Sequence, residues 1–90
     1  MRLDFYREKN ATQTMVRAIE IAGPKRVADL AIPHDKDLLV TKTIHPLYPN
    51  YQHTLSDGHL LNTHSNNEVK KKLLEKISTA LSLGWKVEII

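Results

Sequence analysis

Hydrophobic residues alternate with polar ones near both ends of the chain and recur at helical spacing between them. Leu3 and Phe5 alternate with polar neighbours, which predicts a strand with one buried face. An apolar stripe then predicts a helix, and it is formed by Met15, Ala18, Ile19 and Ala22. The pair Gly23–Pro24 ends this helix, because glycine readily takes the left-handed cap and proline cannot continue the helix.

Shorter elements are expected in the middle of the chain. Pro24 opens a second short helix that Pro33 ends. The inner face of this helix is formed by Val27, Leu30 and Ala31. Residues 38–44 are rich in β-branched types and predict a strand, whereas the two prolines within residues 45–50 indicate an irregular loop.

Residues 52–62 predict a β-hairpin around the turn at 56–58, because Asp57 favours a turn and Gly58 permits a positive φ. Two registers remain open. With a two-residue turn, His53 faces Asn62 and lies diagonal to His64. With a three-residue turn, His53 faces Leu61 and lies diagonal to His59.

The last part of the chain predicts a long helix followed by a strand. Residues 65–68 form a capping box in which the Ser65 hydroxyl and the Glu68 carboxylate satisfy free amides. The apolar face that follows is formed by Val69, Leu73, Leu74, Ile77, Ala80 and Leu81. Gly84 ends the helix, and residues 85–89 alternate as a closing strand.

This order predicts a single α+β domain over residues 1–90, with elements arranged β-α-α(short)-β-β-β-α-β. We expect a small mixed or antiparallel sheet of about four to five strands, with two main helices packed on one face. The two terminal strands either pair with each other or lie at the sheet edges.

The 90 residues are 41% hydrophobic and 26% charged, which is typical of a globular domain and argues against disorder. No cysteine is present, so disulfides are excluded and a reducing, cytoplasmic location is expected. Neither a signal peptide nor a membrane span is indicated. A domain of this size has modest stability, which a homo-oligomer would relieve.

The net charge of +3 permits binding to nucleic acid without requiring it. The candidate contacts fall into two groups, Arg17, Lys25 and Arg26, and Lys70, Lys71 and Lys72. We expect all three lysines of the second group to face solvent. The hypothesis requires both groups to gather on one continuous surface once the chain folds.

Residues 15–31 resemble the first two helices of the Cro-like helix-turn-helix repressors, in which a glycine-containing turn joins two helices ahead of the recognition helix. Residues 32–37 depart from that pattern. They carry a proline and two acids where the recognition helix would follow, and acids there would repel the phosphate backbone. The chain is therefore not assigned to that family.

Five histidines lie within residues 34–64, and histidine serves as base, metal ligand or pH switch. No spacing typical of a zinc site is present, so neither a metal nor another cofactor is assigned. A nuclease or phosphodiesterase that uses two histidines and a lysine is the enzyme hypothesis. No catalytic residue is assigned, and we expect a non-catalytic protein.

Tyr48 and Tyr51 stand in a proline-containing loop, and such loops are common at surfaces that bind proteins or stacked bases. Together with His53 and His59 they are the candidate partner-binding residues. The leading hypothesis is a small protein that binds nucleic acid through its basic residues. The alternative is a protein-interaction module such as an inhibitor, adaptor or subunit.

Overall fold

The computed structural model describes residues 2–5 and 11–89, and it shows a small α+β protein with short strands in small sheets. The helices are α1 (Ala11–Ala22), α2 (Pro24–Asp29), α3 (Asn67–Leu81) and the 3₁₀ turn η1 (Pro49–Tyr51). The strands are β1 (Arg2–Phe5), β2 (Pro33–His34), β3 (Asp37–Leu38), β4 (Val40–Thr41), β5 (Gln52–Thr54), β6 (Leu60–Asn62) and β7 (Lys86–Ile89).

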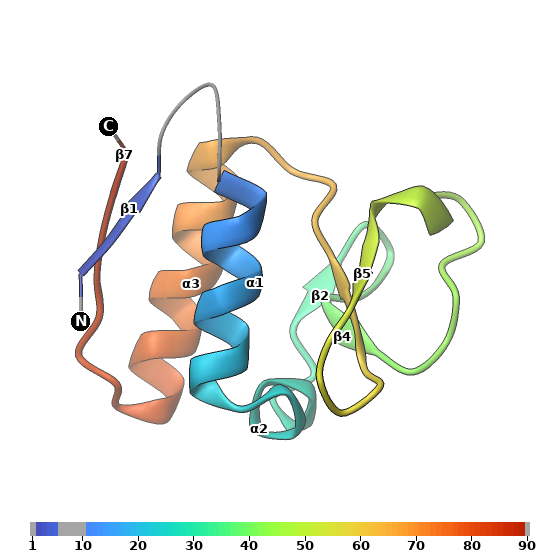
Figure 1. The fold of residues 1–90 in the computed structure, drawn as a ribbon, viewed down its shortest axis with the longest axis horizontal. Coiled ribbons are helices and arrows are strands. Elements are labelled where there is room, and N and C mark those ends of the chain that lie inside the picture. Colours follow the sequence, from blue (N-terminus) through green and yellow to red (C-terminus); the bar gives the residue numbers. More distant parts are fainter. Residues whose placement is uncertain (1, 6–10, 90) are drawn as a thin grey trace.

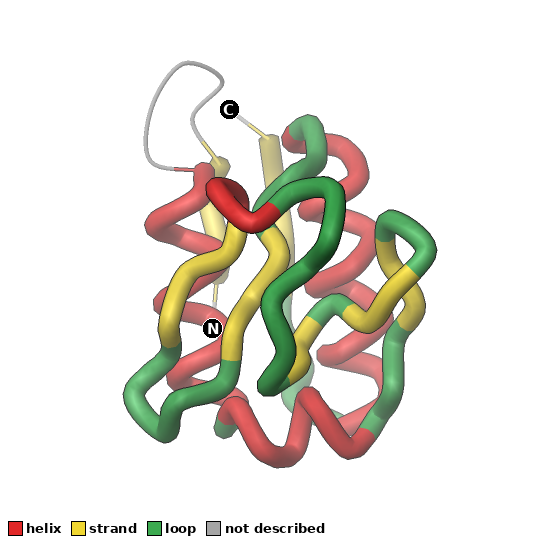
Figure 2. The backbone as a smooth tube through the Cα atoms, turned by 90° about the vertical axis from the view of Figure 1, so that its right-hand side faces the viewer, coloured by secondary structure: helices red, strands yellow, loops and turns green. Residues whose placement is uncertain are grey.

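The two main helices lie between sheets, and α1 and α3 run side by side in the same direction (Figure 1). On one side of them β1 and β7 form a two-stranded parallel sheet, so the terminal strands do pair with each other. On the other side lie the β2–β3 hairpin and a three-stranded antiparallel sheet in the order β4-β6-β5 (Figure 2). The α+β class is confirmed, but the strands form three small sheets instead of one.

The helix stripe predicted for α1 is confirmed. Met15, Ala18, Ile19 and Ala22 are all buried. The amide of Gly23 still donates to Ile19 at 3.0 Å, and Gly23 then adopts a φ of 99°, which explains why a glycine ends the helix. The second helix ends at Asp29, earlier than the predicted limit at Pro33, and Ala31 lies exposed in the following turn.

The strand predicted over residues 38–44 is divided. β3 pairs with β2, β4 pairs with β6, and Leu39 between them is fully buried. The Leu39 amide donates to Ile32 at 2.8 Å, and its carbonyl accepts the Asn62 amide at 2.9 Å. The hairpin formed by β5 and β6 takes the three-residue turn, in which His53 faces Leu61. The register that placed His53 opposite Asn62 is excluded.

The ends of α3 differ from the prediction. The N-cap is Asn66, whose side-chain oxygen accepts the Val69 amide at 2.9 Å, and Ser65 lies one residue outside. The helix ends at Leu81, because Ser82 already has a left-handed φ of 55°, so Gly84 does not end it. The buried face consists of Lys70, Leu74, Ile77 and Ser78, whereas Ala80 is exposed.

Replacing Ile77, which is fully buried in the core, with Ala should lower the free energy of unfolding by about 2–5 kcal/mol. The matched change Leu73→Ala should cost less, because Leu73 only packs against the edge of that core. Urea unfolding of both variants measures the difference. Equal losses would contradict the orientation of α3 described above.

Candidate functional site

An open hollow of about 780 Å³ lies where α1, α3, η1, β5 and the β2–β3 turn meet. The lining residues are Thr12, His34, Asp35, Asn50, Tyr51, His53, Thr63, His64, Ser65, Asn66, Val69 and Lys70. Three of the five histidines and one lysine therefore reach the same hollow from separate elements. Among the described residues that line it, Asp35 is the only acidic one.

Asp35 occupies a tight turn between β2 and β3. Asp35 and Lys36 have φ values of 51° and 65°, and two consecutive left-handed residues are what a two-residue turn between antiparallel strands requires. Asp adopts this conformation more readily than most residues. The His45 ring donates its Nε2 proton to the Asp35 carbonyl at 2.9 Å, so the turn is also held from the adjacent loop.

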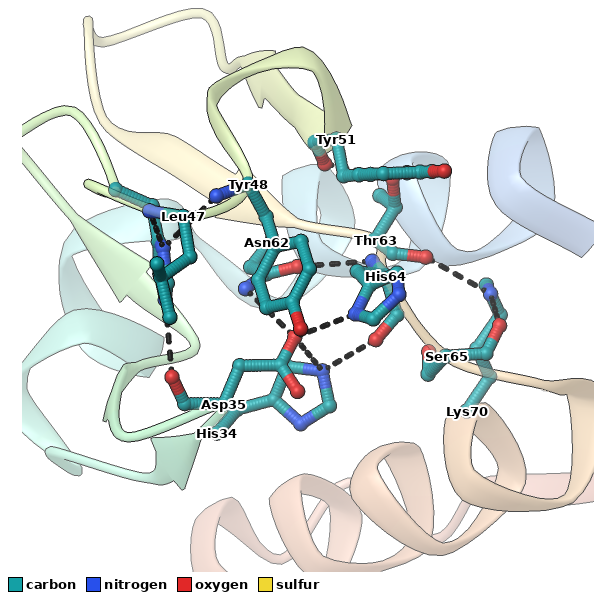
Figure 3. Close-up of polar contacts among 11 residues, drawn as sticks. His34, Asp35, Leu47, Tyr48, Tyr51, Asn62, Thr63, His64, Ser65 and Lys70 are labelled. Carbon is teal, nitrogen blue, oxygen red and sulfur yellow. Dashed lines mark hydrogen bonds and ion pairs between the residues drawn. The ribbon is translucent and has the colours of Figure 1, made fainter.

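The Asp35 carboxylate receives several donors (Figure 3). Its Oδ2 accepts from Asn62 Nδ2 at 3.2 Å and from His64 Nδ1 at 3.0 Å, and His34 Nε2 lies 3.4 Å away. Burial acts to raise the pKa of Asp35, but the hydrogen bond from His64, the proximity of His34 and the hydrogen bond from Asn62 together hold the pKa below its usual value. Asp35 is therefore a carboxylate whose negative charge is already balanced by neighbouring donors.

The segment that joins β6 to α3 is fixed by side chains on both sides. Lys70 Nζ donates to the carbonyls of Thr63, at 3.0 Å, and Ser65. His34 Nε2 donates to the carbonyl of His64 at 2.9 Å. Three successive backbone carbonyls thus have side-chain donors, and His64 sits in the middle of this rigid segment (Figure 3).

Lys70 is only 4% exposed, so the expectation that it faces solvent is wrong. Burial lowers the pKa of its ammonium group. The long side chain spans the start of α3 and satisfies two carbonyls that would otherwise lack a donor. Lys71 and Lys72 on the same turn are respectively half-buried and exposed.

The His64 ring is positioned by aromatic contacts as well as by Asp35. It stacks on Tyr48 with a centroid distance of 4.1 Å and an interplanar angle of 19°, and the Tyr51 ring lies 4.7 Å away. Because the carboxylate of Asp35 only accepts, His64 carries its proton on Nδ1 and leaves a lone pair on Nε2. Among the described residues, no partner occupies that Nε2, and the side chain is 37% exposed.

The remaining two histidines have structural contacts. His45 is buried and its Nδ1 accepts the amides of Leu47, at 3.0 Å, and Tyr48, at 3.1 Å, which shapes the tyrosine loop. His59 is also buried, and its Nδ1 lies 2.6 Å from Asp57 Oδ2 within the hairpin turn. Of the predicted partner-binding residues, Tyr51 and His53 line the hollow. Tyr48 stacks on the ring of His64, and His59 is not among the residues that line the hollow.

The basic residues do not gather on one surface. Lys25 pairs with Asp29 at 3.0 Å, and Arg17 lies beside Arg2 and Asp4 at the β1 side of α1. The short helix α2, which carries Lys25 and Arg26, lies at the opposite end of the helical layer from the start of α3 (Figure 1). The continuous basic surface required by the nucleic-acid hypothesis is therefore absent from these residues.

Sequence reasoning missed Asp35 as the centre of the site. The local signal was weak, because Asp35–Lys36 differs from the Asn-Gly and Asp-Gly pairs that indicate a two-residue hairpin turn. It also missed the buried role of Lys70, which helical periodicity treats as a polar surface position.

Comparison with protein-family models, with curated proteins and with solved structures gives no match for this chain. Among the described residues, no group of three or more His, Cys, Asp or Glu side chains is placed to hold a metal ion. None of the helices in the described part of the chain has both the length and the apolar character needed to cross a membrane.

Replacing Lys70 with Met keeps the apolar stem but removes the ammonium group. We expect the free energy of unfolding to fall by about 1–3 kcal/mol for each carbonyl left without a donor. The matched control Lys72→Met, at an exposed position of the same helix, should change stability by no more than about 0.5 kcal/mol. Equal stability of the two variants in urea unfolding would show that the Lys70 contacts contribute nothing.

Because the pKa of Asp35 is lowered in the folded chain, the free energy of unfolding depends on pH. A carboxylate with a folded-state pKa below its unfolded value of about 3.9 stabilises the fold above that value and loses this contribution as the pH falls through the folded pKa. The stability difference between the wild type and Asp35→Asn should therefore be full at about pH 5 and shrink below about pH 4.

Chemical unfolding at several pH values measures this difference. The Asp35→Asn variant should retain some acid sensitivity, because a backbone hydrogen bond from His59 also lowers the pKa of Asp57. The double variant Asp35→Asn/Asp57→Asn should be flatter still. A difference between the wild type and Asp35→Asn that does not change with pH would contradict this account of Asp35.

Proposed function

We propose that this chain binds single-stranded nucleic acid in the open hollow around His64. The observation that carries the proposal is the convergence on one hollow of His34, His53, His64, Lys70 and the ring of Tyr51. The imidazole of His53 and the ammonium group of Lys70 are of the kind that donates hydrogen bonds to phosphate oxygens, whereas His34 and His64 direct their N–H groups to the chain itself. An exposed aromatic ring offers a face on which a base stacks.

The charges in the hollow favour an anionic ligand. Asp35 is the only acid in the described part of its lining, and its carboxylate already receives donors from His64 and Asn62. Lys70 uses two of its three N–H groups on the carbonyls of Thr63 and Ser65, which leaves one donor for a ligand.

A single strand fits this geometry better than a duplex. The candidate basic residues outside the hollow are separated by the length of the helical layer, so they do not follow a duplex backbone. A volume of about 780 Å³ falls in the usual range of small-ligand sites, and Tyr51 is 48% exposed at its rim. Unpaired bases present the faces that such a ring contacts.

The exposed apolar side chains of the neighbouring loop favour a second candidate, a protein partner. Ile44 is 73% exposed and Leu47 is 64% exposed, and neither lines the hollow. Partners commonly cover such residues. These two positions therefore separate the candidates, since nucleic-acid binding in the hollow does not involve them.

Binding is tested by fluorescence anisotropy of a labelled single-stranded DNA oligonucleotide, titrated with the protein at low salt. Tyr51→Ala should weaken binding by about 1–3 kcal/mol, because one stacking platform is lost. The logarithm of the affinity should fall with the logarithm of salt concentration with a shallow slope of about −0.7 for each phosphate contacted. Ile44→Ser is the matched control and should bind like the wild type.

Two results would contradict the proposal. One is the absence of binding to single strands at low salt. The other is binding that Tyr51→Ala leaves unchanged. Loss of binding to an isolated partner protein in Ile44→Ser, with no nucleic-acid binding by the wild type, would favour the second candidate.

A further inference from the structure

We infer that the hollow is an RNA-cleaving site, in which Asp35 positions His64 to remove the proton of a ribose 2′-hydroxyl. This inference rests on the proposed binding of a single strand and adds a substrate class, RNA, and a reaction. The geometry of His64 carries it. Its Nδ1 is committed to Asp35 at 3.0 Å, and its Nε2 has no partner among the described residues while the ring lines the hollow.

The structure holds His64 as a general base requires. A carboxylate that accepts the Nδ1 proton fixes the tautomer, leaves the Nε2 lone pair free and stabilises the imidazolium that forms when Nε2 takes a proton. The ring is held by its Nδ1 hydrogen bond to Asp35 and by the stacked ring of Tyr48, and the His64 backbone amide is fixed by its hydrogen bond to Asn62 Oδ1 at 2.8 Å. Holding a base in a fixed position beside the group that it deprotonates is itself a large contribution to the rate of a reaction.

Lys70 and His53 supply the other groups that the reaction needs. Lys70 lines the hollow, and its ammonium group adds a positive charge near the phosphate, whose negative charge grows on the non-bridging oxygens as the nucleophile attacks. His53 is exposed and lines the same hollow from β5, so its imidazolium form is a proton donor separate from His64.

The proposed step balances without any further reactant. His64 Nε2 accepts the proton of the 2′-hydroxyl, the 2′-oxygen forms a bond to phosphorus, and the bond from phosphorus to the 5′-oxygen breaks. His53 donates its proton to that departing 5′-oxygen. The products are a 2′,3′-cyclic phosphate on one strand and a 5′-hydroxyl on the other, and proton exchange with water resets both histidines.

The experiment uses a fluorescent DNA oligonucleotide that contains a single ribonucleotide, which offers one possible cleavage position. The full chain should cut it there and leave a terminus with the mass of a 2′,3′-cyclic phosphate. The all-DNA oligonucleotide should bind equally well and remain intact, because it lacks the nucleophile. This comparison changes only the substrate, so it does not depend on the folding of any variant.

Variants then assign the roles. His64→Gln and His53→Gln should each lower the cleavage rate of the fully bound mixed oligonucleotide by about 100-fold or more, well beyond any loss of affinity for the all-DNA strand. Imidazole added in solution should partly restore cleavage by His64→Gly, which a purely structural role would not allow. Lys76→Gln, at an exposed position of α3 outside the hollow, is the control and should cleave at the wild-type rate.

Asp35 is a positioning residue, and its test separates orientation from folding. Asp35→Asn should slow cleavage without weakening the binding of the all-DNA strand, because an amide no longer enforces the reactive tautomer of His64. Asp35→Glu retains a carboxylate and should recover part of the lost rate. Equal rates in these two variants would contradict the positioning role.

The outcomes distinguish the inference from the proposed function. Binding of the mixed oligonucleotide without cleavage would overturn the inference and leave the binding function standing. Cleavage of the all-DNA strand, or cleavage that persists unchanged in His64→Gln, would also overturn it. No binding of either oligonucleotide would overturn both.

Discussion

The arrangement of the site depends on one buried ammonium group. Lys70 lies at the start of α3 with its Nζ on the carbonyls of Thr63 and Ser65. A buried charge is costly unless hydrogen bonds surround it, so these contacts make the burial of Lys70 tolerable and at the same time fix the chain on both sides of His64. The cap of α3 reinforces them, because Asn66 closes the first turn of the same helix. His64 is consequently held by the backbone before its ring makes any contact.

The polar contacts around His64 connect the two sides of the molecule. The helical layer with the β1–β7 sheet forms one side, and the small hairpins form the other (Figures 1 and 2). His34 reaches from β2 to the carbonyl of His64, and Asn62 reaches from β6 to Asp35. The polar contacts of the site therefore also join β2, β6 and α3, which explains how short strands with few ladder hydrogen bonds keep a defined position.

Local patterns in the sequence predicted those elements whose signals are themselves local. The stripe of α1, its end at Gly23 and the hairpin around Gly58 depend on residues close in the chain, and all three are present. The three separate sheets were not predictable in this way, because strand pairing depends on contacts across the whole chain, such as that of Leu3 with Val87. The hairpin register stayed open for a related reason, since a two-residue and a three-residue turn both suit the same Asp-Gly pair.

The candidate site was harder to predict because its chemistry depends on burial. The sequence drew attention to the histidines and to the lysines of α3. What each of them does depends on how far it is buried, and burial is known only once the chain is folded. Lys70 became an internal donor, His45 and His59 became structural, and His64 kept a free Nε2 because Asp35 took its other nitrogen. Asp35 could not be singled out, since its importance arises from a turn conformation and from two partners distant in sequence, Asn62 and His64.

The hydrogen bonds of the histidines around the hollow bear on both the stability and the function of the chain. His45 is buried and uses both ring nitrogens, one on the Asp35 carbonyl and the other on the Leu47 and Tyr48 amides. His59 also places its Nδ1 on a carboxylate, that of Asp57, but it is buried and does not line the hollow. His64 places its Nδ1 on Asp35, lines the open hollow and has no partner on Nε2 among the described residues. The combination of a carboxylate partner with exposure to the hollow is the physical reason to look for the function at His64 and not at His45, His59 or the exposed lysines.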